Sequence, residues 1–342
     1  MPEWRICQSP RLLVGVLFLA LCGCATPPPG VTRPVEKKAP PGLIPPEYFC
    51  PNLALEAVDP KLAREIKNFL EEGGILAGYP GSGNLPMVLN GPVESCLRAF
   101  SRNQKSAFKV YLSRSGRYLP MMRRIFQQRD LPQDLVYLAL IESGFNPFAR
   151  SPAAAVGIWQ FIEGTARRYG LKVNDWVDER RDPEKATRAA AKYLQDLFRQ
   201  FGCWYLAAAG YNAGEHRVET ALGKNDDTTF WTLAQNGSLP QETCHYVPQF
   251  IAAALIARNP QKYGFDDVAY QRPLVYEVVK VPGGTNLHRV AQVLDLDCRD
   301  LKELNPELKT DLAPPEPQEY LLKIPRGNKH KAQILARVKG DS

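Results

Sequence analysis

Apolar residues recur at intervals of three and four over most of residues 93–260, as at Leu135, Leu138 and Ile141. This interval places apolar side chains on one face of an α-helix, so the stretch predicts an all-helical domain. After Gly264 the pattern changes, which indicates that a second, different module follows.

Capping residues indicate where helices begin and end. Asp182 before Pro183 predicts a helix start, because an aspartate accepts hydrogen bonds from first-turn amides and proline fits the first turn. Asp130 and Pro132 predict another start, for a helix that runs to Glu142. Glycines that should end helices are Gly144, Gly170 and Gly214.

The second module is predicted to contain two strands and two short helices. Val275–Val281 alternates and is rich in β-branched residues, which indicates a strand. The other predicted elements are helices at Asn286–Leu294 and Cys298–Leu304 and a closing strand at Tyr320–Ile324. The chain is therefore predicted to be mainly α, with a small βααβ module near its end.

The N-terminus resembles a lipoprotein signal peptide. Basic residues precede a short apolar run, Leu12–Leu21, which is too short to span a bilayer. The following Gly23-Cys24 resembles the end of a bacterial lipobox, and the resemblance implies cleavage before Cys24 and its lipidation. We therefore expect an exported protein anchored to a membrane, and Ala25 favours the outer membrane facing the periplasm. An ordinary signal peptide with an unrelated cysteine is the alternative.

These patterns divide the chain into six segments. Residues 25–46 contain eight prolines, which is typical of an extended tether. The expected segments are a lipoprotein signal peptide (1–23), a Pro-rich tether (24–50), a helical N-terminal extension (51–110), the all-α domain (111–265), the βααβ module (274–326) and a basic tail (327–342).

Composition excludes some classes of function. Hydrophobic residues make up 44% and charged residues 23% of the 342 residues, which suffices for a sizeable core. The formal net charge of +7 is spread along the chain without a basic block, so we expect no nucleic-acid binding. The histidines are scattered and no CxxC occurs, so we expect no metal site, and nothing in the pattern requires a cofactor.

Glu142 follows an apolar run, Val136–Ile141, at the predicted C-terminal end of a helix. Desolvation by apolar neighbours and the negative end of the helix dipole both disfavour its charged form. Both raise the pKa of the carboxyl, as a general acid near neutral pH requires. A solvated glutamate at a helix end is the alternative, and the spacing alone does not decide between the two.

Several motifs occur in order around and after Glu142. They are Glu142-Ser143-Gly144-Phe145-Asn146-Pro147-Phe148, Trp159-Gln160-Phe161, Tyr211-Asn212-Ala213-Gly214, Leu239-Pro240-Gln241-Glu242-Thr243 and Tyr246-Val247-Pro248. Together they resemble the soluble-lytic-transglycosylase family, with spacing closest to its membrane-bound D type, over roughly residues 112–265. The resemblance implies a lysozyme-like fold, peptidoglycan glycan strands as substrate, and cleavage that leaves 1,6-anhydro ends.

The resemblance also implies residue roles. Glu142 would be the single acid/base, because the substrate itself supplies the nucleophile, whereas ordinary glycosidases use two carboxyl groups. The substrate-binding positions carried over are Ser151, Gln160, Tyr211, Asn212 and Tyr246, and the supporting positions are Ser143, Gly157, Gly214 and Glu242. Tyr211 matches the tyrosine that orients the catalytic carboxyl, and Tyr246 would lie on the groove wall. Backbone roles are the alternative for Gly157 and Gly214.

The sequence departs from the family pattern at a few positions. Ala154 stands where the family usually has glycine, and Gly210 replaces an alanine. Ile162-Glu163 replaces the common Met-Pro, and a glutamate there could alter the charge of the groove. None of these changes removes a proposed catalytic group.

Five cysteines remain after the expected cleavage and lipidation. They are Cys50, Cys96, Cys203, Cys244 and Cys298. An exported protein folds in an oxidising compartment, so disulfides are possible, and the odd number leaves at least one thiol outside any internal pair. Cys203 and Cys244 lie close in sequence to the two motif tyrosines, and a Cys203–Cys244 disulfide is our hypothesis from that location.

Residues 276–325 resemble a LysM glycan-binding domain. Leu301-Lys302-Glu303-Leu304-Asn305-Pro306 is the most characteristic piece, whereas the usual Gly-Asp-Thr turn appears as Gly283-Gly284-Thr285. Two alternatives to a transglycosylase stay open: a hydrolytic muramidase of the goose-lysozyme type, and a non-enzymatic peptidoglycan-binding lipoprotein. The family motifs around Glu142 are intact, which argues against the non-enzymatic alternative.

Overall fold

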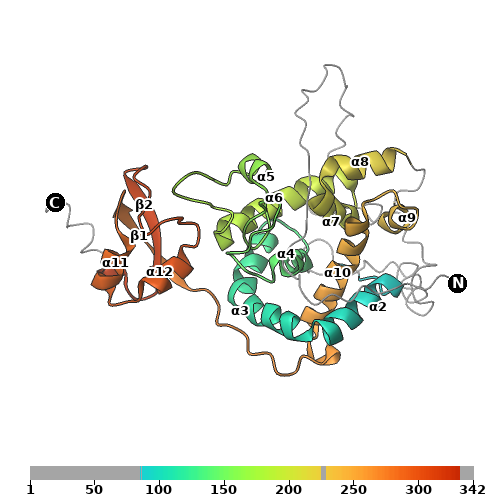
Figure 1. Ribbon diagram of the computed structural model, residues 1–342, viewed down its shortest axis with the longest axis horizontal. Helices are drawn as coiled ribbons and strands as arrows, with labels where there is room; N and C mark the ends of the chain where they lie inside the picture. Colours follow the sequence, from blue (N-terminus) through green and yellow to red (C-terminus); the bar gives the residue numbers. More distant parts are fainter. Residues whose placement is uncertain (1–84, 86, 225–228, 332–342) are drawn as a thin grey trace, which may run out of the picture.

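The computed structural model describes residues 85, 87–224 and 229–331. The predicted signal peptide, Cys24, the Pro-rich tether and most of the basic tail lie outside these residues. Two parts follow one another in the described chain: a larger helical part, and a smaller part that contains a sheet (Figure 1).

The larger part consists of helices joined by turns and by two longer non-helical segments. Its α-helices are α2 (Gly91–Arg98), α3 (Lys105–Gln127), α4 (Leu138–Ser143), α5 (Glu163–Arg168), α6 (Pro183–Phe201), α7 (Trp204–Ala213), α8 (Glu215–Gly223), α9 (Phe230–Gln235) and α10 (Gln241–Arg258). A π-helix, η3 (Ala99–Asn103), and the 3-10 helices η4 (Gln133–Tyr137) and η5 (Gln261–Tyr263) complete it. The predicted mainly α fold class is confirmed.

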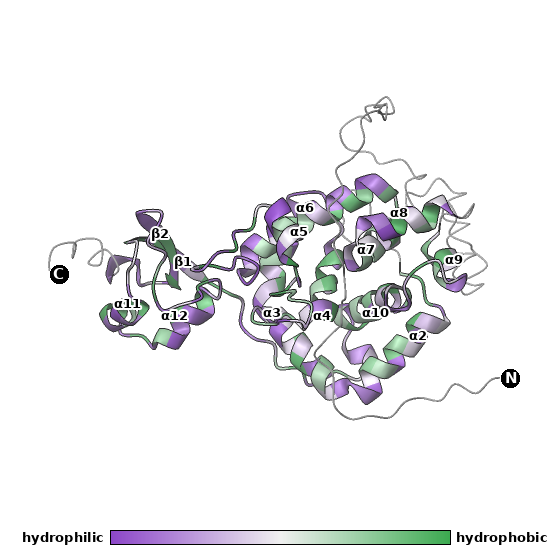
Figure 2. Ribbon diagram, turned by 45° about the horizontal axis from the view of Figure 1, so that its top comes forward, coloured by the Kyte–Doolittle hydropathy of each residue, from purple (hydrophilic) through white to green (hydrophobic). Residues whose placement is uncertain are grey.

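Helix α7 is the centre of this part, and α6, α8 and α10 pack around it (Figure 2). Residues 204–210 are all buried, and Ala207, Ala208 and Ala209 have no exposed surface. Such small side chains let neighbouring helices approach closely, because the distance between packed helices depends on the side chains at the contact. This part of the helix is therefore apolar on all sides, as is typical of a helix segment enclosed by its neighbours.

Helix α3 crosses the expected boundary between residues 110 and 111. Phe108 before the boundary and Leu112 after it are buried in the same hydrophobic core. The chain before α2 joins this core too, because Asp134 accepts a hydrogen bond from the Leu85 amide at 2.6 Å and pairs with Arg258. Residues 87–110 thus pack on the helical domain.

The helix expected from Asp130 to Glu142 is instead a 3-10 turn, η4, followed by the short α4. Asp130 has a left-handed backbone with a φ of 53°. An N-cap residue needs an extended backbone to reach the first-turn amides, so Asp130 caps no helix. By contrast, Asp182 has that backbone and accepts hydrogen bonds from the Glu184 and Lys185 amides, which confirms the predicted start of α6.

Two segments within residues 93–260 are not helical, contrary to the prediction: residues 144–162 and 169–182. Isolated bridges join Arg150 to Val156 and Val156 to Phe161 within residues 149–161, which we call the active-site loop. Ile158 and Trp159 of this loop are fully buried. Their apolar character reflects burial in the core, which periodicity does not distinguish from a helix face.

Arg180 holds the active-site loop against residues 178–182. Its guanidinium forms two hydrogen bonds of 2.8 Å with the Asp178 carboxylate, and both side chains are buried. The same guanidinium donates to the carbonyl oxygens of Ala154 (3.0 Å) and Phe161 (3.2 Å). A planar guanidinium has several donors and here serves four acceptor oxygens, so a single side chain joins Asp178 to two positions of the active-site loop.

The smaller part contains the predicted strand–helix–helix–strand order. Its elements are β1 (Tyr276–Pro282), α11 (Leu287–Leu294), α12 (Cys298–Leu304) and β2 (Glu319–Pro325). The strands pair antiparallel, from Tyr276 opposite Pro325 to Pro282 opposite Glu319. A separate hydrophobic core fills this part, and Val177 of the larger part is buried in it. The predicted βααβ module is confirmed.

The chain between the two parts runs along α3. The Gln271 and Leu274 amides donate to the Ser113 and Arg117 carbonyl oxygens, both at 2.9 Å. Gly116 permits this contact, because an ideal Cβ there would lie 2.5 Å from the Gln271 carbonyl oxygen. The linker is thus hydrogen-bonded to the larger part on its way to the sheet.

The hypothesised Cys203–Cys244 disulfide is wrong. Cys244 is a free thiol, as are Cys96 and Cys298, whereas Cys203 is disulfide-bonded. The sulfur of Cys244 instead lies 3.6 Å from the Leu239 carbonyl oxygen and 3.7 Å from that of Ala234. Closeness in sequence to the active-site motifs did not bring the two sulfur atoms together.

Within the described ranges, no helix is both long and apolar enough to cross a membrane.

A Gly157→Ala substitution should destabilise the protein by about 3 kcal/mol or more, through backbone strain and overpacking. Its φ is 86°, and an ideal Cβ would lie 1.8 Å from the Arg180 carbonyl oxygen. Gly170→Ala is the matched control, because Gly170 has a φ of 87° but open space around it. The control should lose only about 1–2 kcal/mol in urea unfolding. Equal losses would contradict the contact between the active-site loop and Arg180.

Candidate active site

Glu142 lies in the last turn of α4, where the chain leaves the core. Gly144 ends this helix with a φ of 58°, and no side chain fits there, because an ideal Cβ would lie 2.1 Å from the ring of Tyr111. The residues before Glu142, from Leu138 to Leu140, are buried, whereas Glu142 itself is partly buried. The short helix thus brings one carboxyl from the core to its edge.

Tyr246 holds this carboxyl from the other side of the site. The hydroxyl of Tyr246 donates a hydrogen bond of 2.6 Å to Oε1 of Glu142. Tyr246 belongs to α10 and is buried, so its ring cannot easily swing away. The contact joins residues that are 104 positions apart and fixes the direction in which the carboxyl points.

Burial raises the pKa of Glu142 from 4.5 to about 7. The Tyr246 hydrogen bond opposes this rise because it favours the charged form, and the negative charge of Glu242 adds to it. A carboxyl with a pKa near ambient pH can both donate and accept a proton, as an acid/base catalyst must. The rise expected from desolvation at this position therefore agrees with the structure.

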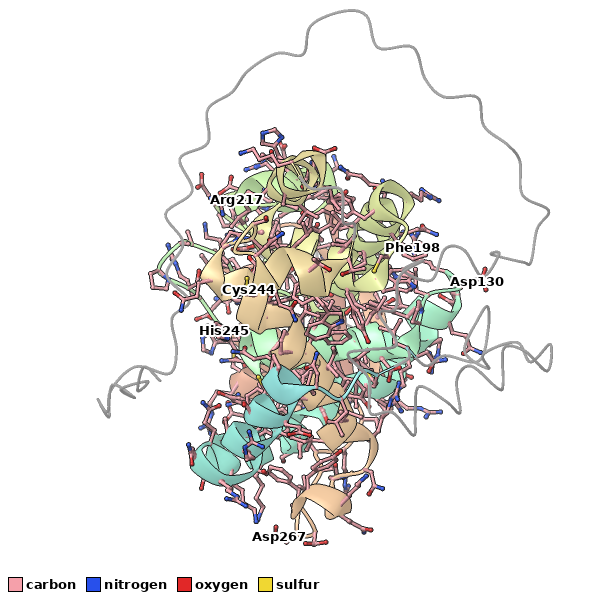
Figure 3. All side chains as sticks on the ribbon, turned by 90° about the vertical axis from the view of Figure 1, so that its right-hand side faces the viewer. Asp130, Phe198, Arg217, Cys244, His245 and Asp267 are labelled. Atoms are coloured by element: carbon pink, nitrogen blue, oxygen red, sulfur yellow. The ribbon has the colours of Figure 1, made fainter. Side chains whose placement is uncertain are left out.

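Glu242 is a second carboxyl beside the site. Asn212 links it to the end of α7: the Asn212 amide donates to Glu242 at 3.4 Å and accepts from the Thr243 hydroxyl at 2.9 Å. Burial raises the pKa of Glu242, and Asn212 and Arg217 oppose the rise. Figure 3 shows Arg217 on α8 above the start of α10, where Cys244 and His245 are labelled.

Tyr211 does not hold the Glu142 carboxyl, contrary to the role carried over from the family. Its hydroxyl donates instead to the Trp159 carbonyl oxygen at 2.8 Å. Burial raises the pKa of Tyr211 well above 10, and the charge of Glu142 adds to the rise, so the two groups are near each other. The structure thus gives the orienting hydrogen bond to Tyr246 and gives Tyr211 a contact with the active-site loop.

The remaining predicted residues shape the loop around Glu142. Ser143 donates to the Ile158 carbonyl oxygen at 2.8 Å and accepts from the Asn146 amide at 3.1 Å. Ser151 accepts from the Ala155 amide at 3.1 Å. Gln160 has a φ of 48° and donates to the Gly157 carbonyl oxygen at 2.7 Å. The hydrogen bonds of Ser151 and Gln160 lie within the loop, and Gly214 turns the chain between α7 and α8 with a φ of 86°.

The departures from the family pattern have local explanations. Ala154 has a φ of 60°, a conformation that favours glycine. Gly210 fits close packing, because an ideal Cβ there would lie 2.9 Å from the Phe201 ring. Glu163 pairs with Arg167 at 2.8 Å on an exposed helix face. The charge expected to alter the groove is therefore paired on α5.

Three residues contribute to the site in ways that were not predicted from the sequence. Thr243 positions Asn212, and Arg217 acts on Glu242. Arg180 bonds to the loop carbonyl oxygens of Ala154 and Phe161, and these contacts have no sequence signal. No cluster of three or more potential metal-ligating side chains occurs in the portion of the chain that the structure describes.

Two family models match the chain in the order of its two parts. Residues 122–234 match the transglycosylase SLT domain, and residues 275–336 match the LysM-like domain of the lytic transglycosylase MltD. The chain therefore carries an SLT domain followed by an MltD-type LysM-like domain. The predicted lysozyme-like class of the SLT domain and the resemblance to the membrane-bound D type are confirmed.

Named relatives share these domains. The chain is 34% identical over 240 residues to the membrane-bound lytic murein transglycosylase D of Escherichia coli K12, covering 69% of this chain and 51% of that protein. It is 32% identical over 142 residues to the soluble lytic murein transglycosylase of the same strain, covering 40% and 22%. The chain thus spans about half the length of the D-type relative.

Solved structures of similar sequence are also lytic transglycosylases. An inactive mutant of Slt from Pseudomonas aeruginosa is 26% identical, with a TM-score of 0.36, over 44% of this chain and 25% of that one. The 70-kDa soluble lytic transglycosylase of Escherichia coli is 22% identical, with a TM-score of 0.39, over 67% and 40%.

A Tyr246→Phe substitution should raise the pKa of Glu142 above its value of about 7, because it removes a hydrogen bond that favours the carboxylate. We expect a rise of about 1 unit in a carbon-13 NMR titration of the side-chain carboxyl. Tyr211→Phe is the matched control and should leave the pKa of Glu142 in place, since the Tyr211 hydroxyl bonds to Trp159. The opposite ranking would give Tyr211 the orienting role.

A Glu142→Gln substitution should stabilise the SLT domain at high pH. The folded pKa of Glu142 exceeds 4.5, so its ionisation destabilises the fold as pH rises from 4.5 to about 7. Partial exposure moderates this cost, and we expect a gain of about 1–3 kcal/mol at pH 8 that disappears near pH 4. Urea unfolding of both proteins across this range measures it, and a difference that does not change with pH would contradict the raised pKa.

Proposed function

We propose that this protein is a peptidoglycan lytic transglycosylase that cleaves the β-1,4 bond between MurNAc and GlcNAc in glycan strands. The observation that carries the proposal is the Glu142 carboxyl of an SLT domain, held by Tyr246, with a pKa raised to about 7. The substrate follows from the matched families and from the relatives' names, which refer to murein.

In the first step, protonated Glu142 gives its proton to the glycosidic oxygen, and the bond from MurNAc C1 to that oxygen breaks. Because Tyr246 donates to Oε1, the other oxygen is the one that carries the transferred proton. The substrate's acetamido group shares the positive charge that develops at C1. The charges of Glu142 and nearby Glu242 also favour this cation.

In the second step, the Glu142 carboxylate accepts the proton of the MurNAc C6 hydroxyl, and the C6 oxygen bonds to C1. This step closes the 1,6-anhydro ring, consumes no water and returns Glu142 to its protonated form. One enzyme carboxyl therefore serves as acid and then as base, as microscopic reversibility permits.

Hydrolysis is the second candidate function, because Glu242 provides a carboxyl that could activate water. It lies close enough for its charge to raise the pKa of Glu142. Inverting glycosidases use such a pair, one carboxyl as acid and one as base for water. Against this role, Glu242 is hydrogen-bonded to Asn212, which favours a supporting position.

We also propose the residue roles and location expected from the sequence. Ser151, Gln160, Tyr211 and Asn212 would line the glycan groove, and the LysM-like domain would contact the glycan strand. Lipid on Cys24 would anchor the protein at the outer membrane, with the Pro-rich tether leading to the catalytic domain. The relative's description as membrane-bound supports this location.

The decisive experiment is mass spectrometry of muropeptides released from purified sacculi by the chain lacking residues 1–24. We expect products lighter by one water than their reducing counterparts. Glu142→Gln should lower their formation by about 10²–10⁴-fold, the usual contribution of an acid/base group. Reducing-end products would favour hydrolysis, and the absence of products from the wild type would favour a binding role.

Glu242→Gln separates the two chemistries. In transglycosylation it should retain activity, with an alkaline limb shifted to lower pH, because removing the charge of Glu242 lowers the pKa of Glu142. The wild type should lose kcat/KM as pH rises through about 7, where Glu142 gives up its proton. If Glu242 is instead the base for water, the variant should be as inactive as Glu142→Gln.

A further inference from the structure

The LysM-like domain is packed against residues 174–184 of the SLT domain, which we call the docking segment. Val177 forms an isolated bridge with Leu308 and is buried in the core of the LysM-like domain. The Asp178 amide donates to the Glu307 carbonyl oxygen at 2.8 Å, and the Lys309 amide donates to that of Trp176 at 3.0 Å. The docking segment thus binds the LysM-like domain through backbone hydrogen bonds and through the burial of Val177 in its hydrophobic core.

A buried charge cluster crosses the same contact. Lys323 of β2 is 8% exposed and lies 2.6 Å from Asp182 and 3.4 Å from Glu307. Asp182 is also the N-cap of α6, so one carboxylate serves the helix and the domain contact. Beside it, the Tyr276 hydroxyl donates to Glu184 at 2.5 Å. Removing the lysine would leave two buried carboxylates without their cation, which is strongly unfavourable.

The opposite face of the docking segment holds the active-site loop. Asp178, whose amide bonds to the LysM-like domain, pairs through its carboxylate with Arg180. Arg180 in turn donates to the Ala154 and Phe161 carbonyl oxygens. The docking segment therefore lies between the LysM-like domain on one side and the active-site loop on the other.

The active-site loop is bonded to the catalytic residues. Its Ile158 carbonyl oxygen accepts from Ser143, the neighbour of Glu142, and its Trp159 carbonyl oxygen accepts from Tyr211. Hydrogen bonds and an ion pair thus connect the LysM-like domain through Asp178 and Arg180 to the active-site loop, and the loop backbone connects these contacts to Ser143 and Tyr211.

We propose that the LysM-like domain is a positioning element of the catalytic site, with Lys323 as the residue that keeps it docked. The proposal rests on the proposed function and adds a role distinct from glycan binding. In the docked state Lys323 neutralises the charge of Asp182, and backbone hydrogen bonds from the LysM-like domain hold the docking segment in place. The docking segment then holds Arg180 against the active-site loop. Lys323 itself touches no substrate and acts through these residues.

A tethering role makes a different prediction. A domain that only binds glycan raises the effective concentration of long strands, so its loss raises KM for strands that reach both sites. A positioning domain affects the chemical step for every substrate, so its loss lowers kcat on short and long strands alike.

The test compares the full chain with its Lys323→Met variant on short and long glycan strands. We expect kcat to fall about 10–100-fold on both, the effect of a small misplacement of catalytic groups, while KM changes by less than about 2-fold. Lys280→Met is the matched control, because Lys280 lies in the paired strand β1 and its ion pair with Glu319 is exposed. It should retain wild-type kcat.

Hydrogen exchange supplies a readout that does not depend on activity. In Lys323→Met, amides of residues 149–161 should exchange at least about 10-fold faster, while those of α7 stay protected because the core remains folded. Unchanged exchange in the loop, wild-type kcat, or a loss confined to KM on long strands would each overturn the proposal. An inactive wild type with the predicted exchange difference would reject the proposed function and retain the positioning role.

A second variant covers the case in which Lys323→Met does not fold. Tyr276→Phe combined with Lys309→Ala removes hydrogen bonds to Glu184 and to the Asn174 carbonyl oxygen without leaving a buried charge. We expect the same pattern at smaller size, a loss of about 2–10-fold in kcat together with faster exchange in the loop. No change in either measurement would overturn the proposal.

Discussion

The hydrogen bond between Tyr246 and Glu142 is the constraint around which the SLT domain is arranged. A carboxyl with a pKa near 7 must be shielded from water yet open to substrate, so it can lie only at the edge of the core. The short α4 brings it there, and the buried α10 supplies the donor. The two helices pack against each other, and α10 also packs against the small buried side chains of α7.

The non-helical segments shape the rest of the site around Glu142. The active-site loop has residues with positive φ at Ala154, Gly157 and Gln160, and such a backbone needs support from outside. Arg180 provides it by donating to two loop carbonyls while its charge is neutralised by Asp178. The site therefore depends on a segment that is remote from Glu142 in sequence and carries no proposed catalytic group.

Much of this arrangement could be predicted from the sequence, and the exceptions share a cause. Local signals worked: the Asp182 cap, the glycine at the end of α4 and the alternating strand at Tyr276 all appear as expected. The family motifs identified Glu142, but the donor to it was assigned to Tyr211 instead of Tyr246. Contacts between distant segments decide which tyrosine faces the carboxyl, which cysteine is paired and which carbonyl oxygens Arg180 binds. Periodicity and capping describe only local structure and do not encode such contacts.

The chain between the two domains is laid along α3 and bonded to it at Ser113 and Arg117. A flexible linker behaves as a random coil with high conformational entropy, and its two ends sample many separations. A linker whose amides are bonded to a helix has already lost that entropy during folding. A change in its length would shift which linker amides meet the α3 carbonyl oxygens, and would not simply increase the range of distances between the domains. The linker thus fixes the spacing between the two domains, and under the proposed function a glycan strand that contacts both domains would have to match that spacing.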